Sequence, residues 1–155
     1  MIDYYGIYKW NYLRNGCQIA NAQLETDMFN EEYLEWRASM AQLLDVQFGD
    51  EVYKIFADIV DAFCDMEFVL QGSKAKGDFD ARKDRILDYV YNTTISCLHK
   101  YNVRNAGVLV SQAQELVYEA NCMKPISKTS GKVTKGNEWK DPKIEIMKLI
   151  EKYTK

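Results

Sequence analysis

The chain has 155 residues, of which 47% are hydrophobic and 28% are charged, and its formal net charge is −3. This length suits one domain with its own core and is too short for two full domains. The slightly acidic balance excludes a general nucleic-acid-binding protein, because no basic stripe is present to neutralise phosphates along a duplex.

The sequence also argues against a membrane protein. It contains no run of about 18 apolar residues that would span a bilayer. Its first residues, MIDYYGIYKWNYLRNG, lack a basic stretch followed by an apolar block. We therefore expect no membrane partner and a cytoplasmic location.

Helical periodicity runs through almost the whole chain up to residue 124, and both prolines lie beyond that point. After a short helix or irregular arm before residue 14, the spacing predicts four helices, near 17–46, 49–72, 79–100 and 104–123. The breaks between them are short, so successive helices should be antiparallel neighbours. Residues 1–124 are therefore predicted to form an all-α, antiparallel helical bundle of about four to five helices.

Residues 125–155 differ in composition but are predicted to belong to the same domain. They hold both prolines and many lysines, which predicts a lysine-rich arm followed by a last short helix near IEIMKLIEKY (144–153). Between Asn121 and Lys143 there are six lysines and two acidic residues. This segment is a basic patch attached to an acidic body.

The stretch FADIVDAFCDMEFVLQG, residues 56–72, is an apolar helix that carries a row of acids. Asp58, Asp61 and Asp65 are spaced by three and four residues, so their carboxylates share one stripe of the helix. Lys54, one turn earlier, could pair with Asp58, but no such lysine is available locally for the other two. Aspartate has a poor helix propensity, so this row indicates a role beyond filling a surface and requires a partner from elsewhere.

A second acidic pair lies on the preceding helix. In NEEYLEWRASM, Glu32 and Glu35 are three residues apart, and across an antiparallel interface they could meet Asp61 and Asp65. Facing carboxylates raise one another's pKa, and a divalent cation relieves the repulsion. Oxygen ligands without histidine or thiolate select Mg²⁺, for which Mn²⁺ can substitute. Lysines nearby could bind the phosphates of a substrate. The pattern therefore favours phosphoryl transfer, in which a water activated by the metal and a carboxylate attacks a phosphorus.

Other site types fit the sequence less well. A Glu-x-x-Glu pair is also common on solvated helix faces, and the lysine tail is also typical of a solvated arm. The single histidine, His99, weakens any triad or multi-histidine metal site, and with Ser96 three positions before it there is no Glu-x-x-His motif for a di-iron centre. No Cys-x-x-Cys pair is present, so we expect free thiols, at Cys17, Cys64, Cys97 and Cys122.

The order of these motifs resembles the all-α nucleoside triphosphate pyrophosphohydrolases of the MazG-like superfamily. The family pattern is a Glu-x-x-Glu helix followed by an acid-bearing helix. Its phage-type, phosphoribosyl-ATP pyrophosphohydrolase-like group has a second motif similar to DAFCDMEFVLQG (61–72). That group also carries a tail similar to VYEANCMK (117–124), GKVTKG (131–136) and DPKIEIMKLI (141–150). The resemblance spans roughly residues 28–150.

Carried over by position, the resemblance implies a set of site residues. The Mg²⁺ ligands would be Glu32, Glu35, Asp61 and Asp65, and the nucleotide and phosphate contacts would be Asn121, Lys124, Lys132 and Lys135. Two departures from the family pattern stand out. Asp58, rather than Asp65, has the family's acid spacing with Asp61, so either Asp58 or Asp65 can be the stronger metal ligand. Met123 stands at a position where a serine is common in the family.

We therefore expect a Mg²⁺-dependent enzyme that hydrolyses a nucleoside triphosphate between its α and β phosphates, in which Glu35 or Glu32 orients or deprotonates the water. The resemblance favours a role in remodelling the deoxynucleotide pool, with dGTP or another purine substrate, and implies a homodimer or homotetramer that completes the site. The alternatives are a dUTP pyrophosphatase activity and a non-catalytic helical interaction module whose acids pair with lysines of a partner subunit.

Overall fold

The computed structural model describes residues 21–46, 49–123 and 139–154. These residues form five helices: α2 (Ala22–Gln42), α3 (Asp50–Ala75), α4 (Ala81–Lys100), α5 (Ala106–Cys122) and α6 (Lys143–Thr154). No strand is present in this part of the chain, so the predicted all-α class is confirmed. None of the described helices combines the length and the apolar character that a membrane span requires.

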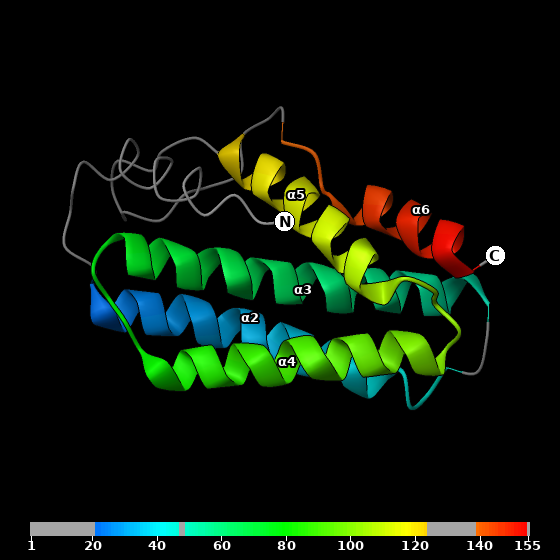
Figure 1. The fold of residues 1–155 in the computed structure, drawn as a ribbon, viewed down its shortest axis with the longest axis horizontal. Helices are drawn as coiled ribbons and strands as arrows, with labels where there is room; N and C mark the ends of the chain where they lie inside the picture. The colour runs from blue at the N-terminus through cyan, green and yellow to red at the C-terminus, as the bar shows by residue number, and fades with distance from the viewer. Residues whose placement is uncertain (1–20, 47–48, 124–138, 155) are drawn as a thin grey trace.

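The central helix is α3. It contacts each of the other four described helices, with α2 and α4 on one side and α5 and α6 on the other (Figure 1). Successive helices run in opposite directions, as expected from their short connections. Because α3 is surrounded, its side chains from Phe56 to Ala75 are all buried or half-buried, and the exposed polar side chains described on α3, Glu51 and Lys54, lie in its first turns.

The helix ends differ from the predicted ones for local reasons. The helix predicted to end at residue 72 continues to Ala75, because Gly72 is buried inside the helix and the stop comes at Gly77. Gly77 has φ +86°, and the next N–H, of Asp78, donates to Ser73 O over 2.9 Å, which is the pattern of a glycine-terminated helix. At the start of α4, Asp80 accepts from the backbone N–H of Arg82 and sets the helix start at Ala81 rather than 79.

Two further helices, α2 and α5, are shorter than predicted. α2 ends at Gln42, four residues before the predicted end at 46. The first four residues of the predicted range 17–46 lie outside the described residues, as does the arm before residue 14. Asn105 has φ +52°, a left-handed conformation that a helix cannot include, so α5 begins at Ala106 rather than at 104.

The core lies along both sides of α3. Phe56, Ile59 and Met66 of α3 are almost completely buried, as are Phe29 of α2 and Leu109 of α5. Each such side chain contributes about 1.5–3 kcal/mol through burial. A polar contact crosses this core, where Trp36 Nε1 on α2 donates to Thr94 Oγ1 on α4 over 3.0 Å.

The last helix docks through its own apolar stripe. Ile146 and Ile150 of α6 are completely buried, and α6 contacts α3 and α5. The end of α6 is also fixed, because the backbone N–H of Arg104 donates to Tyr153 O over 2.8 Å. The predicted short terminal helix is thus confirmed, and it extends from Lys143 to Thr154.

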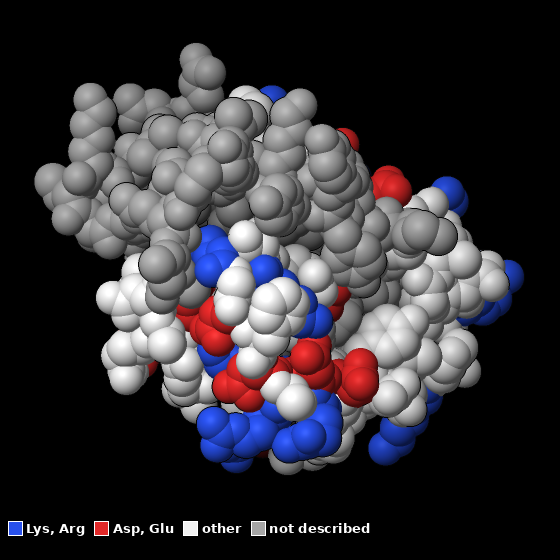
Figure 2. Space-filling model, turned by 60° about the vertical axis from the view of Figure 1, so that its left-hand side comes forward, with Lys and Arg blue, Asp and Glu red and all other residues white. Residues whose placement is uncertain are grey.

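Ion pairs gather at the end of the bundle where α2 and α4 begin and α3 ends. Figure 2 brings this end forward and shows acidic side chains lying among basic ones. The pairs there are Lys74 with Asp84, Lys76 with Glu25, and Lys83 with Asp78. Glu25 is buried and also accepts a 2.6 Å hydrogen bond from Ser73 Oγ, so this end of α2 is fixed to the end of α3.

Candidate functional site

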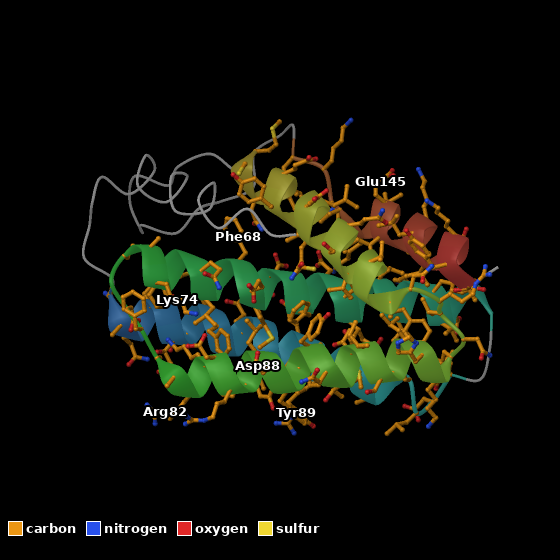
Figure 3. All side chains as sticks on the ribbon, viewed as in Figure 1. Phe68, Lys74, Arg82, Asp88, Tyr89 and Glu145 are labelled. Carbon is orange, nitrogen blue, oxygen red and sulfur yellow. The ribbon has the colours of Figure 1, made fainter. Side chains whose placement is uncertain are left out.

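The candidate site starts from the acidic stripe of α3. Asp61 is buried, whereas Asp58 and Asp65 are half-buried. The surrounding positions of the helix are apolar and pack on neighbouring helices: Phe68, for example, projects from α3 toward α5 (Figure 3) and contacts the ring of Tyr118. The carboxylates are thus held at fixed positions by a helix that is packed on several sides.

The glutamates of α2 meet this stripe. Glu32 is half-buried, and Glu35, one turn later, is exposed. The pKa of Glu32 is raised to about 9, first by burial and then by the negative charges of Asp65, Glu35 and Asp61 in that order. Among the described residues, Glu32 Oε2 is the buried side-chain oxygen that has no hydrogen-bond partner. Four carboxylates from two antiparallel helices therefore lie close enough for their charges to raise the pKa of the most buried members.

Asp61 has a similar environment. Its pKa is raised to about 8, first by burial and then by the charge of Asp65. Lys143 lowers this pKa, but Asp141 and Asp58 add to the rise. The lysine therefore offsets only part of the repulsion that the neighbouring carboxylates exert on Asp61.

Two residues from the other side of α3 complete the cluster. Asn121, buried near the end of α5, donates from Nδ2 to Asp65 Oδ1 over 3.4 Å. Lys143, the first residue of α6, lies with Nζ 3.5 Å from Asp58 Oδ1 and 4.0 Å from Asp61 Oδ2. The lysine that pairs with Asp58 is thus Lys143 from another helix, and not Lys54 as the helical spacing suggested.

The structure brings together most of the residues that the sequence singled out. Glu32, Glu35, Asp61 and Asp65 interact electrostatically, and Asp58 contributes to the same field. Asn121 lies against this cluster. The predicted phosphate contacts are Lys124, Lys132 and Lys135, and all three lie outside the described residues. In the described ranges, no three Asp, Glu, His or Cys side chains converge tightly enough to form a ready-made ion cage.

Sequence reasoning missed the site roles of Lys143 and Asp141. Lys143 was counted only within the basic tail, yet it precedes Ile146 and Ile150 by three and seven residues, which places it on the stripe that α6 buries. Asp141 accepts from the backbone N–H of Lys143 over 3.0 Å and so caps α6, while its charge reaches Asp61. The i, i+3, i+7 spacing with two isoleucines was the signal available in the sequence.

The other candidate groups in the sequence are the thiols and the single histidine. Cys64, Cys97 and Cys122 are thiols and not disulfide-bonded, as predicted, and Cys17 lies outside the described residues. Burial raises the pKa of the Cys64 thiol well above its usual range, with further rises from Asp61 and Asp65, so this thiol stays protonated. His99 is exposed in the last turn of α4.

Comparisons of the chain with models of protein families, with curated proteins and with solved structures find no match.

Proposed function

We propose that this chain is a Mg²⁺-dependent hydrolase that converts a nucleoside triphosphate to its monophosphate and pyrophosphate. The observation that carries the proposal is the meeting of Glu32 and Glu35 on α2 with Asp61 and Asp65 on α3. The order of motifs, which resembles the MazG-like pyrophosphohydrolases, supports the same reaction.

The residues present fit a divalent metal ion. Glu32 Oε2 is a buried oxygen that has no hydrogen-bond partner, and the cluster offers oxygen donors of the kind that Mg²⁺ and Mn²⁺ prefer. Glu32, Glu35, Asp61 and Asp65 would hold the ion. Because these side chains do not form a finished cage, binding requires rotation of their side chains on helices that stay in place.

A bound Mg²⁺ supplies charge neutralisation for the phosphates and makes a coordinated water more acidic. The chain itself supplies position and a proton acceptor. Glu35 is exposed and so is accessible to bulk water, which suits it to orient or deprotonate the attacking water; Glu32 is the other candidate. Asn121 fixes the rotamer of Asp65 by its hydrogen bond. The lysines at 124, 132 and 135 are proposed to bind the phosphates.

The reaction consumes one water. The water oxygen bonds to a phosphorus of the α–β anhydride, the bond from that phosphorus to the bridging oxygen breaks, and the proton of the water passes to a carboxylate. The resemblance favours a deoxynucleotide, dGTP or another purine, with dUTP as the alternative, and a homodimer or homotetramer as the assembly.

The test is an assay of ribo- and deoxynucleoside triphosphates with Mg²⁺ in which pyrophosphate and orthophosphate are measured separately. The wild-type chain should release pyrophosphate only when metal is present. Asp65→Asn should abolish this release. The matched control is Asp88→Asn, which removes an exposed carboxylate from α4, and it should keep wild-type activity.

Two results would contradict the proposal. One is orthophosphate as the first product, which would place cleavage at another bond. The other is no release with any nucleotide, together with a melting temperature that Mg²⁺ leaves unchanged. In that second case, weakened assembly of Asp65→Asn would favour the non-catalytic module.

A further inference from the structure

Lys143 reaches the acidic stripe of α3 from a position that packing fixes. It lies three residues before Ile146 and seven before Ile150, both of which are completely buried, so all three share the stripe of α6 that docks against the bundle. From there Nζ lies 3.5 Å from Asp58 and 4.0 Å from Asp61. The contact is therefore set by the docking of a helix and not by a free surface side chain.

A lysine in the first turn of a helix is locally unfavourable. The N-terminus of a helix carries partial positive charge, which prefers acidic side chains and disfavours cationic ones. Asp141 offsets part of this cost by accepting from the backbone N–H of Lys143. A residue that breaks the local preference while its side chain meets two carboxylates indicates a role set by those carboxylates.

The positive charge of Lys143 is stable in this environment. A lysine side chain is ordinarily protonated at neutral pH, and the carboxylates of Asp58 and Asp61 lie 3.5 Å and 4.0 Å from its Nζ. The side chain is 40% exposed, so the ammonium also keeps contact with water. Lys143 is thus a permanent cation at one end of the acidic cluster.

We propose that Lys143 takes the place of a second divalent ion at the pair Asp58 and Asp61, and thereby limits the cluster to one metal ion per chain. The inference rests on the proposed function for the presence of a metal site. With Asp58, Asp61 and Asp65 on one side and Glu32 and Glu35 on the other, the cluster carries enough carboxylates for the two ions that phosphoryl-transfer sites often hold. Lys143 occupies the end formed by Asp58, so the ion that Glu32, Glu35, Asp61 and Asp65 would hold lies toward the other end, and Asp61 is shared between the lysine and that ion.

The experiment is a titration of the full chain with Mn²⁺, with free Mn²⁺ followed by its electron paramagnetic resonance signal. Wild type should bind one ion. Lys143→Met should bind a second ion, or bind the first about tenfold more tightly, because a neighbouring positive charge is gone. Lys143→Arg, which keeps the charge, should bind like wild type.

The control and a second variant make the test specific. Lys148→Met removes the same charge from the same helix, but the partner of Lys148 is Glu145, so its Mn²⁺ binding should match wild type. Asp58→Asn should weaken Mn²⁺ binding far less than Asp65→Asn does, because Asp58 pairs with Lys143 and not with the metal ion. This comparison holds even where Lys143→Met does not fold.

The outcomes separate the two proposals. Two Mn²⁺ ions bound by the wild-type chain would overturn the role of Lys143, as would the same number and affinity of Mn²⁺ ions in Lys143→Met and wild type. Neither result would contradict the metal site itself. Equal losses from Asp58→Asn and Asp65→Asn would do the same. No Mn²⁺ bound by any of these proteins would overturn the metal site and the role of Lys143 together.

Discussion

Asn121 on α5 donates a hydrogen bond from its side-chain amide to Asp65 on α3, over 3.4 Å and from a buried position. It is an uncharged residue in contact with a cluster whose described charged members include several carboxylates and Lys143. Its amide supplies a donor to a carboxylate without adding charge. The asparagine therefore stabilises Asp65 in a way that an isosteric acid cannot.

Asn121→Asp tests this relationship. The substitution replaces a donor by a carboxylate beside Asp65, so without metal it should lower the free energy of unfolding by about 1–3 kcal/mol. Urea unfolding in a chelator measures the change, and Mg²⁺ should restore more stability to the variant than to wild type. Asn92→Asp, at an exposed position of α4, is the matched control and should be within about 0.5 kcal/mol of wild type. Equal effects of the two substitutions would contradict the role assigned to Asn121.

The raised pKa values of Glu32 and Asp61 predict how the stability of the metal-free protein depends on pH. The pKa is raised from 4.5 to about 9 for Glu32 and from 3.8 to about 8 for Asp61. Between these values the folded chain binds more protons than the unfolded chain, so the free energy of unfolding falls as pH rises. The stabilisation is complete below the ordinary values and is lost as pH rises toward 8 to 9.

Urea unfolding in a chelator from pH 5 to pH 9 should show this fall, on the order of a few kcal/mol. Glu32→Gln should flatten the curve, because its amide stays neutral at every pH. Asp88→Asn should retain the wild-type slope, since its carboxylate is exposed. Stability that rises across this range in wild type would show that these carboxylates are ionised in the folded protein.

The meeting of Glu32 with Asp61 and Asp65 could be predicted from sequence because it follows from local rules. Spacings of three and four residues place side chains on one face of a helix, and a short break makes the next helix antiparallel. The docking of Lys143 could not be predicted in the same way. A tail rich in lysine and glycine gives no local signal of where its last helix will pack, and that packing decides which carboxylates the lysine meets.

Gly72 and Gly77 show a second limit of sequence reasoning. Both are glycines near the end of a predicted helix, and the first was interpreted as the stop. Burial of Gly72 inside the bundle overrides its weak helix propensity, a cost of about 1 kcal/mol. Gly77 is the residue that adopts a positive φ. Tertiary packing decides which glycine ends the helix, and the spacing of residues along the sequence does not predict that packing.

Thr94→Val should destabilise the protein through Trp36. Thr94 is completely buried and accepts the indole N–H over 3.0 Å, so valine keeps the shape but leaves a buried donor without a partner. We expect a loss of about 1–3 kcal/mol in the free energy of unfolding, measured by urea titration. Thr93→Val, at the adjacent half-buried position, is the control and should cost less. A loss no larger than that of the control would mean that the indole N–H finds another acceptor.

Lys76→Met should be among the most destabilising single changes at the charged end of the bundle. Lys76 pairs with Glu25, whose side chain is 2% exposed, so the substitution leaves a carboxylate buried without its cation. Breaking such a pair from one side costs about 3–5 kcal/mol. Lys74→Met is a matched control on the same helix, because its partner Asp84 is 45% exposed and an exposed pair contributes about 1 kcal/mol or less. Urea unfolding of both variants at neutral pH measures the difference. Similar losses would show that Glu25 is stabilised by the hydrogen bond from Ser73 and not by the charge of Lys76.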